Sequence, residues 1–79
     1  MAEQDRVRAY LERQREERGL RQRDLSLMLG LDPVTIGRIE RGERTIDLGE
    51  WIAIARVLNL DPADMLREAL AETAENGNN

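Results

Sequence analysis

Apolar side chains recur at helical spacing near the start of the chain. Val7, Tyr10 and Leu11 occupy positions i, i+3 and i+4 within an otherwise charged segment. This pattern predicts an amphipathic helix over residues 5–18. Gly19 follows directly, and glycine is the preferred residue just beyond a helix C-terminus.

Two shorter helices are predicted next, over residues 22–29 and 33–41. Gly30 ends the first of them, and two residues later Asp32 and Pro33 open the second. Aspartate is a strong N-cap, and proline is favoured at the first helical position because its missing N–H would have no partner there. The short segment between the two helices leaves room only for a tight turn.

The remaining pattern predicts a fourth and a fifth helix. Asp47 is the N-cap of an apolar segment, residues 48–58, and Asp61-Pro62 opens a helix that extends to about Thr73. The inward stripe of the fourth helix is expected to contain Leu48, Trp51, Ile52, Ala55 and Leu58. The sequence therefore predicts an all-α, five-helix domain over residues 1–73, followed by a disordered polar tail over residues 74–79.

Composition narrows the classes of function. The 79 residues include neither cysteine nor histidine. Disulfides, thiolate–zinc sites and the usual neutral-pH acid–base group are therefore missing, and we expect no enzyme, no metal and no cofactor. No secretory signal and no membrane-length apolar segment are present, so we expect a cytoplasmic protein without a membrane partner.

Charge is distributed unevenly along the chain. The net charge is −4, yet residues 1–45 contain ten arginines and nine carboxylates, whereas residues 46–79 contain two arginines and seven carboxylates. The first part can therefore approach phosphates, and the second is expected to face away from them.

Residues 22–41 have the anatomy of a helix-turn-helix. The fifth residue of this segment is Ser26, which is small enough to let two helices cross closely. The ninth is Gly30, which can adopt the positive φ of the turn. Ile36 and Ile39, at the fifteenth and eighteenth positions, are expected to insert into the core. Four matching positions in twenty residues make this a strong signal.

The wider sequence resembles the lambda-repressor-like family of helix-turn-helix proteins, the phage Cro and repressor type that is also called XRE-type. The matching residues are Arg15 to Gln22, Asp24-Leu25, Gly30-Leu31, Thr35-Ile36, Arg38 to Gly42, Ile54-Ala55, Leu58 and Asp61-Pro62. The resemblance implies a compact five-helix domain that binds double-stranded DNA and regulates transcription. It further implies a homodimer on a two-fold operator, as in phage regulators, antitoxin-type autorepressors or restriction–modification controllers.

The resemblance also implies two polar contacts. Arg15 of the first helix would pair with Glu40 of the third, although both residues could instead be solvated surface charges. Gln22, at the start of the second helix, would hold a DNA phosphate and steady the recognition helix.

The outward face of the third helix, predicted to be Pro33, Val34, Gly37, Arg38 and Arg41, would enter the major groove. Family members often have hydrogen-bonding residues at the first three of these positions, so this face is sparse. Val34 could contact a thymine methyl, and Arg38 could read guanine. The expected DNA-binding residues are Arg21, Gln22, Arg23, Val34, Thr35, Arg38, Arg41 and Arg44, in which arginines at both flanks contact phosphates.

Two apolar groups indicate protein partners. In the resembling family the subunits meet near the fifth helix, where this chain has Met65, Leu66, Ala69 and Leu70. The first two are partly needed for the monomer core, so Ala69 and Leu70 are the better candidates for a dimer interface. Leu27 and Met28 are apolar where the family is usually polar. They are either scattered surface residues or a patch for another protein, and the second reading supports an alternative function as a protein-interaction module, such as an antitoxin or adaptor.

Overall fold

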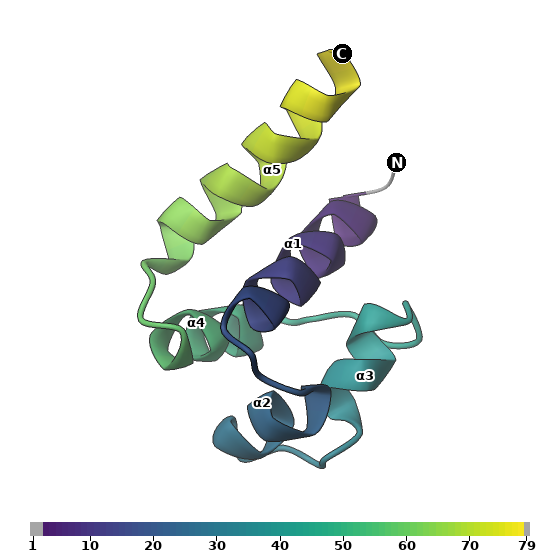
Figure 1. Ribbon diagram of the computed structural model, residues 1–79, viewed down its shortest axis with the longest axis vertical. Helices are drawn as coiled ribbons and strands as arrows, with labels where there is room; N and C mark the ends of the chain where they lie inside the picture. Colours follow the sequence, from purple (N-terminus) through teal and green to yellow (C-terminus); the bar gives the residue numbers. More distant parts are fainter. Residues whose placement is uncertain (1–2, 79) are drawn as a thin grey trace.

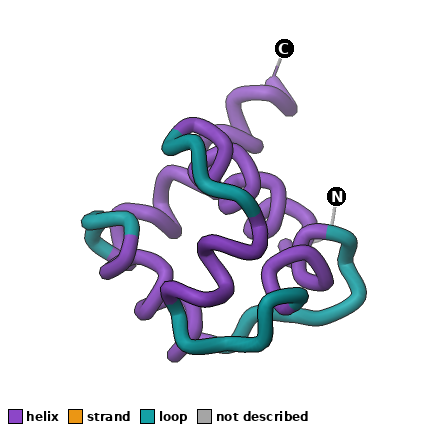
Figure 2. Tube along the Cα trace, turned by 60° about the horizontal axis from the view of Figure 1, so that its bottom comes forward, coloured by secondary structure: helices purple, strands orange, loops and turns teal. Residues whose placement is uncertain are grey.

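Two long helices, α1 (Glu3–Glu17) and α5 (Pro62–Asn78), lie side by side and run in opposite directions in the computed structural model (Figure 1). The structure describes the backbone of residues 3–78 and the side chains of residues 3–71. Three shorter helices, α2 (Gln22–Met28), α3 (Thr35–Glu40) and α4 (Leu48–Val57), lie at one end of the long pair. The described part of the chain contains helices and loops without a strand (Figure 2), so the predicted all-α, five-helix fold is confirmed.

All five helices contribute to the core. Its buried members are Tyr10, Leu11, Leu25, Ile36, Ile39, Trp51, Ile54, Ala55, Leu58, Met65 and Ala69. The rings of Tyr10 and Trp51 have centroids 6.4 Å apart and are tilted by 36°. The indole N–H of Trp51 donates to the carbonyl of Pro62 at 2.9 Å, which ties α4 to the start of α5. None of the described helices is long and apolar enough to cross a membrane.

The predicted caps of α4 and α5 are present. Asp47 accepts a hydrogen bond from the N–H of Glu50 at 2.8 Å, and the Glu50 carboxylate accepts from the N–H of Asp47 at 3.1 Å. This reciprocal arrangement satisfies two amides that would otherwise have no partner. Asp61 accepts from the N–H groups of Ala63 and Asp64, at 2.8 and 2.9 Å.

Several predicted helix boundaries are wrong, among them the start of α1, which begins at Glu3 and not at residue 5. α3 begins at Thr35 and not at Pro33, because the preceding residues form a turn in which the N–H of Thr35 donates to the carbonyl of Asp32 at 3.0 Å. α5 continues beyond the predicted end at Thr73. No side chain after Ala71 is described, so the division into a domain of residues 1–73 and a disordered tail of residues 74–79 stays a prediction.

The predicted inward stripe of α4 is also partly wrong. Leu48 is 74% exposed, and Ile52 is only half-buried. The buried residues are Trp51, Ile54, Ala55 and Leu58, which stand at i, i+3, i+4 and i+7. The stripe is therefore centred one turn after the helix start, and the first apolar residue of α4 lies outside it.

Candidate nucleic-acid interface

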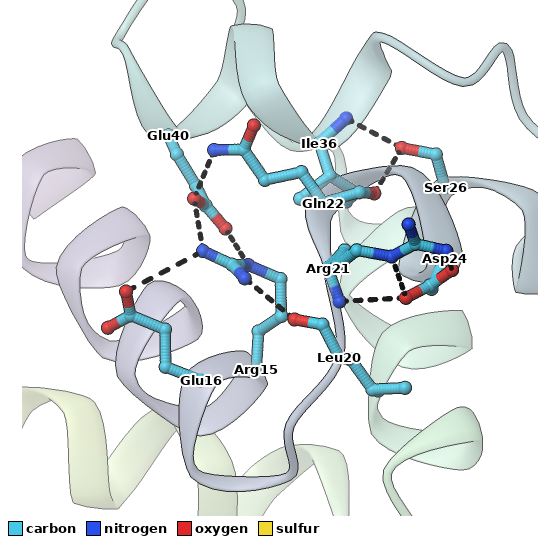
Figure 3. Close-up of polar contacts among 9 residues, drawn as sticks. All are labelled: Arg15, Glu16, Leu20, Arg21, Gln22, Asp24, Ser26, Ile36 and Glu40. Carbon is cyan, nitrogen blue, oxygen red and sulfur yellow. Dashed lines mark hydrogen bonds and ion pairs between the residues drawn. The ribbon is translucent and has the colours of Figure 1, made fainter.

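The crossing of α2 and α3 is fixed by Ser26 (Figure 3). This side chain is fully buried; its hydroxyl donates to the carbonyl of Gln22 and accepts from the N–H of Ile36, both at 3.0 Å. Ile36 lies in the first turn of α3, where backbone N–H groups have no partner within the helix. Ser26 therefore keeps the helices close and completes the start of α3. Gly30, in the connecting turn, has φ +73°, as the sequence predicts.

The structure brings Arg15 and Glu40 together as a buried ion pair. The guanidinium donates from Nε to one carboxylate oxygen at 2.7 Å and from Nη2 to the other at 3.0 Å (Figure 3). Its Nη1 donates to the carbonyl of Leu20 at 2.7 Å. The two side chains are 10% and 4% exposed, so they are not solvated surface charges. Hydrogen bonding to Glu40 raises the pKa of Arg15, and the pair ties α3 to the end of α1.

Gln22 extends this polar contact to α2. Its amide nitrogen donates to Glu40 Oε1 at 2.7 Å, so one carboxylate receives hydrogen bonds from both α1 and α2. Gly37, which the sequence places on the outward face of α3, is instead buried. A Cβ at this position would lie 2.9 Å from Gln22 Oε1, so the missing side chain gives the glutamine room to cross α3.

Arg8 is a further structural residue that the sequence analysis missed. Its Nη1 donates to the backbone carbonyl of Glu40 at 3.1 Å, at the C-terminal end of α3. Its Nε donates to Asp5 at 3.0 Å. The only signal in the sequence was the i, i+3 spacing of Asp5 and Arg8, which does not reveal a contact with a residue so distant in sequence.

Three of the four arginines expected to contact phosphates are paired with carboxylates of their own chain. The pairs are Arg21 with Asp24, Arg41 with Glu43, and Arg44 with Glu50. In each pair the arginine hydrogen bonds lower the pKa of the carboxyl group. The side chain of Arg21 gives α2 no cap, but Asp24 accepts a hydrogen bond from the N–H of Arg21 at 2.9 Å.

Arg23 and Arg38 differ from these three. Both are exposed, and neither has an ion pair within the described residues. Val34, just before α3, is also exposed, whereas Thr35 is buried at the start of the helix. The face formed by α2 and α3 therefore offers two exposed arginines that no ion pair holds, although Asp24 interacts electrostatically with Arg23 and Glu43 with Arg38.

The burial expected for α5 is reversed at two positions. Ala69 is in the core and Leu66 is 44% exposed, whereas Met65 is buried as expected and Leu70 is half-buried. Leu66 lines a hollow of about 230 Å³ with Leu48, Val7 and Trp51 at the junction of α1, α4 and α5. Leu27 and Met28, on α2, are each about half exposed.

The family model described as Helix-turn-helix (HTH_3) matches residues 11–65. None of the curated proteins matches the sequence. Among solved structures, the clp gene regulator ClgR from Corynebacterium glutamicum is 22% identical with a TM-score of 0.84, covering 98% of this chain and 82% of that one.

Two restriction–modification controller proteins have the same fold. C.Esp1396I is 23% identical with a TM-score of 0.83, covering 95% of this chain and 97% of that one. C.AhdI from Aeromonas hydrophila is 29% identical with a TM-score of 0.73, covering 82% of this chain and 98% of that one. The similarity extends over nearly the whole of the folded chain.

Proposed function

The chain belongs to the Helix-turn-helix family and is a DNA-binding transcription regulator, and we propose that it acts as a homodimer on a two-fold operator with α3 in the major groove. The observation that carries this proposal is the pair Arg23 and Arg38. They lie on α2 and α3, they are exposed, and neither makes an ion pair within the described residues. Arg38 would read a base, and Arg23 would contact the backbone beside it.

The buried contacts around Glu40 support a rigid reading surface. α3 has only six residues, so its own hydrogen bonds give it little stability. Arg15, Gln22 and Ser26 hold it against α1 and α2. A helix fixed in this way can enter the groove without a large loss of conformational entropy on binding.

The dimer in this proposal uses the hollow at α1, α4 and α5. Leu48 and Leu66 are large apolar side chains exposed beside it. Two copies related by a two-fold axis would bury these residues and present both α3 helices to half-sites about 34–36 Å apart. This chain covers 97% of C.Esp1396I and 98% of C.AhdI, the two controller proteins with the same fold.

The salt dependence of DNA affinity tests the proposal. A dimer that uses arginines at both flanks neutralises about six to eight phosphates, so log K should fall with log salt with a slope of about −5 to −7. The measurement is fluorescence anisotropy with a labelled duplex of the protein's own upstream region, between low and physiological salt. No binding at low salt, or a slope near zero, would contradict the proposal.

A second candidate is a protein-interaction module that uses Leu27 and Met28. Their exposure on adjacent positions of α2 favours it. Leu27→Glu should then abolish complex formation with that partner, whereas DNA affinity should not depend on this substitution. Loss of DNA binding without loss of a protein complex would contradict this alternative.

A further inference from the structure

Arg41 lies over the glycine of α3. It immediately follows the helix, and its side chain runs back along it, so that a Cβ at Gly37 would lie 3.1 Å from Arg41 Nη1. Gln22 Oε1 lies beside the same point, at 2.9 Å. The guanidinium of Arg41 therefore lies over Gly37, in the space that a side chain at this position would occupy.

Glu43 holds this guanidinium from one side. Arg41 donates from Nε to Glu43 Oε2 at 2.8 Å and from Nη2 to Glu43 Oε1 at 3.3 Å. Guanidinium has five N–H donors, so both donors of Nη1 and one of Nη2 stay available. Arg44 is different, because its Nη1 and Nη2 both donate to Glu50, at 3.0 and 2.6 Å. The pair of terminal nitrogens that could bind a base is therefore already occupied in Arg44.

The charge of Glu43 decides what the open donors of Arg41 can bind. A phosphate would approach a carboxylate that is itself 52% exposed, and like charges repel. The edge of a guanine carries no net charge and presents two acceptors, O6 and N7, at the spacing of an arginine fork. A carboxylate that orients an arginine without blocking its fork therefore favours a base over the DNA backbone.

We propose that Arg41 reads a guanine in the major groove, that Glu43 is the positioning residue for its guanidinium, and that Gly37 provides the space. This inference rests on the proposed function. It assigns Arg41 to a base, whereas the sequence analysis expected Arg41 to contact a phosphate. It also gives the sparse face of α3 a second base-reading side chain beside Arg38.

The test begins with the sequence preference of the wild-type protein. Duplexes that it binds are selected from a pool with a randomised centre, and affinities are then measured for the selected duplex and for variants with each G·C pair replaced. Arg41→Lys keeps the charge but removes the fork. We expect it to lose discrimination at one G·C pair per half-site by about 5- to 150-fold, with little change on scrambled DNA.

Glu43→Gln separates positioning from a merely structural role. It removes one negative charge, so affinity for scrambled DNA should rise slightly, while discrimination at the same G·C pair falls. Asp64→Asn is the matched control, because it removes one carboxylate from an exposed arginine pair on α5. The control should leave the base preference unchanged, whereas a destabilised fold would lower affinity for both duplexes.

Gly37→Ala provides an independent variant. The new methyl group would meet the far ends of Gln22 and Arg41. The helix propensity of alanine opposes the strain on the hydrogen bond from Gln22 to Glu40, so we expect little net change in the melting temperature of the variant. It should nevertheless lose the Arg41-dependent preference, since the guanidinium must move.

Equal losses on selected and scrambled DNA for Arg41→Lys would overturn the inference and leave the proposed function intact. An unchanged base preference in Glu43→Gln or Gly37→Ala would also overturn it. If the wild-type protein binds no duplex at low salt, the proposed function fails, and the inference fails with it.

Discussion

Arg38 presents the simplest case at the scale of single residues, because its side chain is exposed on α3 and no carboxylate of the described chain pairs with it. Arg38→Ala should weaken binding to the selected duplex by about 1–3 kcal/mol and binding to scrambled DNA by much less. Titrations of both duplexes at one salt concentration measure the difference. Equal losses would identify Arg38 as a phosphate contact.

Glu50 links one arginine pair to the stability of α4. Its hydrogen bonds from Arg44, together with one from the N–H of Asp47, hold the pKa of the Glu50 carboxyl below its ordinary value. A depressed pKa in the folded state means that folding favours the ionised form. This stability is present above the ordinary glutamate pKa of about 4.3 and is lost as the pH falls through the folded-state value.

We therefore expect Glu50→Gln to lower the free energy of unfolding at pH 7 by about 0.2–1 kcal/mol. Glutamine keeps an oxygen for the N–H of Asp47, so the variant removes mainly the charge. The difference from wild type should shrink as the pH falls below the ordinary glutamate pKa. Urea unfolding from pH 7 to pH 3 measures it, and parallel curves for the two proteins would contradict the assignment.

Residue positions were predicted well where a local rule applies and poorly where long side chains decide. Ser26 and Gly30 have the predicted places, since crossing distance and positive φ restrict residue type directly. Gly37 was predicted to be exposed, but the long side chains of Gln22 and Arg41 lie over it. Helical periodicity gives the direction of each position and not the contacts of long side chains from elsewhere in the chain. Leu48 was predicted to be buried from its apolar character alone.

At the scale of elements, α1 and α3 are joined by the buried pair of Arg15 and Glu40. Removing one partner leaves an uncompensated buried charge, which costs about 3–5 kcal/mol. A domain of 79 residues has a total stability of about 4–12 kcal/mol. Arg15→Met and Glu40→Leu should therefore each lower the melting temperature by more than about 10 °C.

The double variant should be more stable than the sum of the single effects predicts, because neither charge is then left alone. Thermal melting followed by circular dichroism gives the coupling energy of the cycle. Additive effects would mean that the two residues do not act as a pair.

Helix ends show the same contrast between local and distant causes. The caps at Asp47 and Asp61 were predictable because the residues concerned are within three positions of one another. The contacts that fix α3 come from other helices: Ser26 at its start, and Arg8 at its end. Arg15 was assigned to Glu40 through family resemblance and not from spacing, which is why Arg8, for which no such guide was used, was missed.

At the scale of the whole molecule, the proposed dimer depends on which apolar residues the monomer leaves exposed. Leu66 is exposed beside the hollow at α1, α4 and α5, whereas Ala69 is buried in the core of the monomer and is not accessible to a second copy. Leu66→Glu should shift the protein to monomer and weaken operator binding without a change in helix content. Sedimentation velocity and far-ultraviolet circular dichroism measure the two properties.

Leu27→Glu is the matched control for this variant. Leu27 is exposed to a similar degree, but it lies on α2, away from the hollow. The control should remain dimeric. A wild-type protein that is monomeric both free and on its operator would contradict the dimer, and in that case neither variant would change the sedimentation coefficient.

The positions of the chain ends have a practical consequence. The first turn of α1 and the last turn of α5 lie at one end of the long axis of the molecule, and α2 and α3 lie toward the other (Figure 1). The chain is about 37 Å long in this direction. A reporter joined to the start of α1 by ten flexible residues would remain, on average, within about 20 Å of that end. A fluorescent protein or an activation segment could thus be carried there without obstructing the groove-facing surface, which makes this fold suitable as a compact targeting module for synthetic gene circuits.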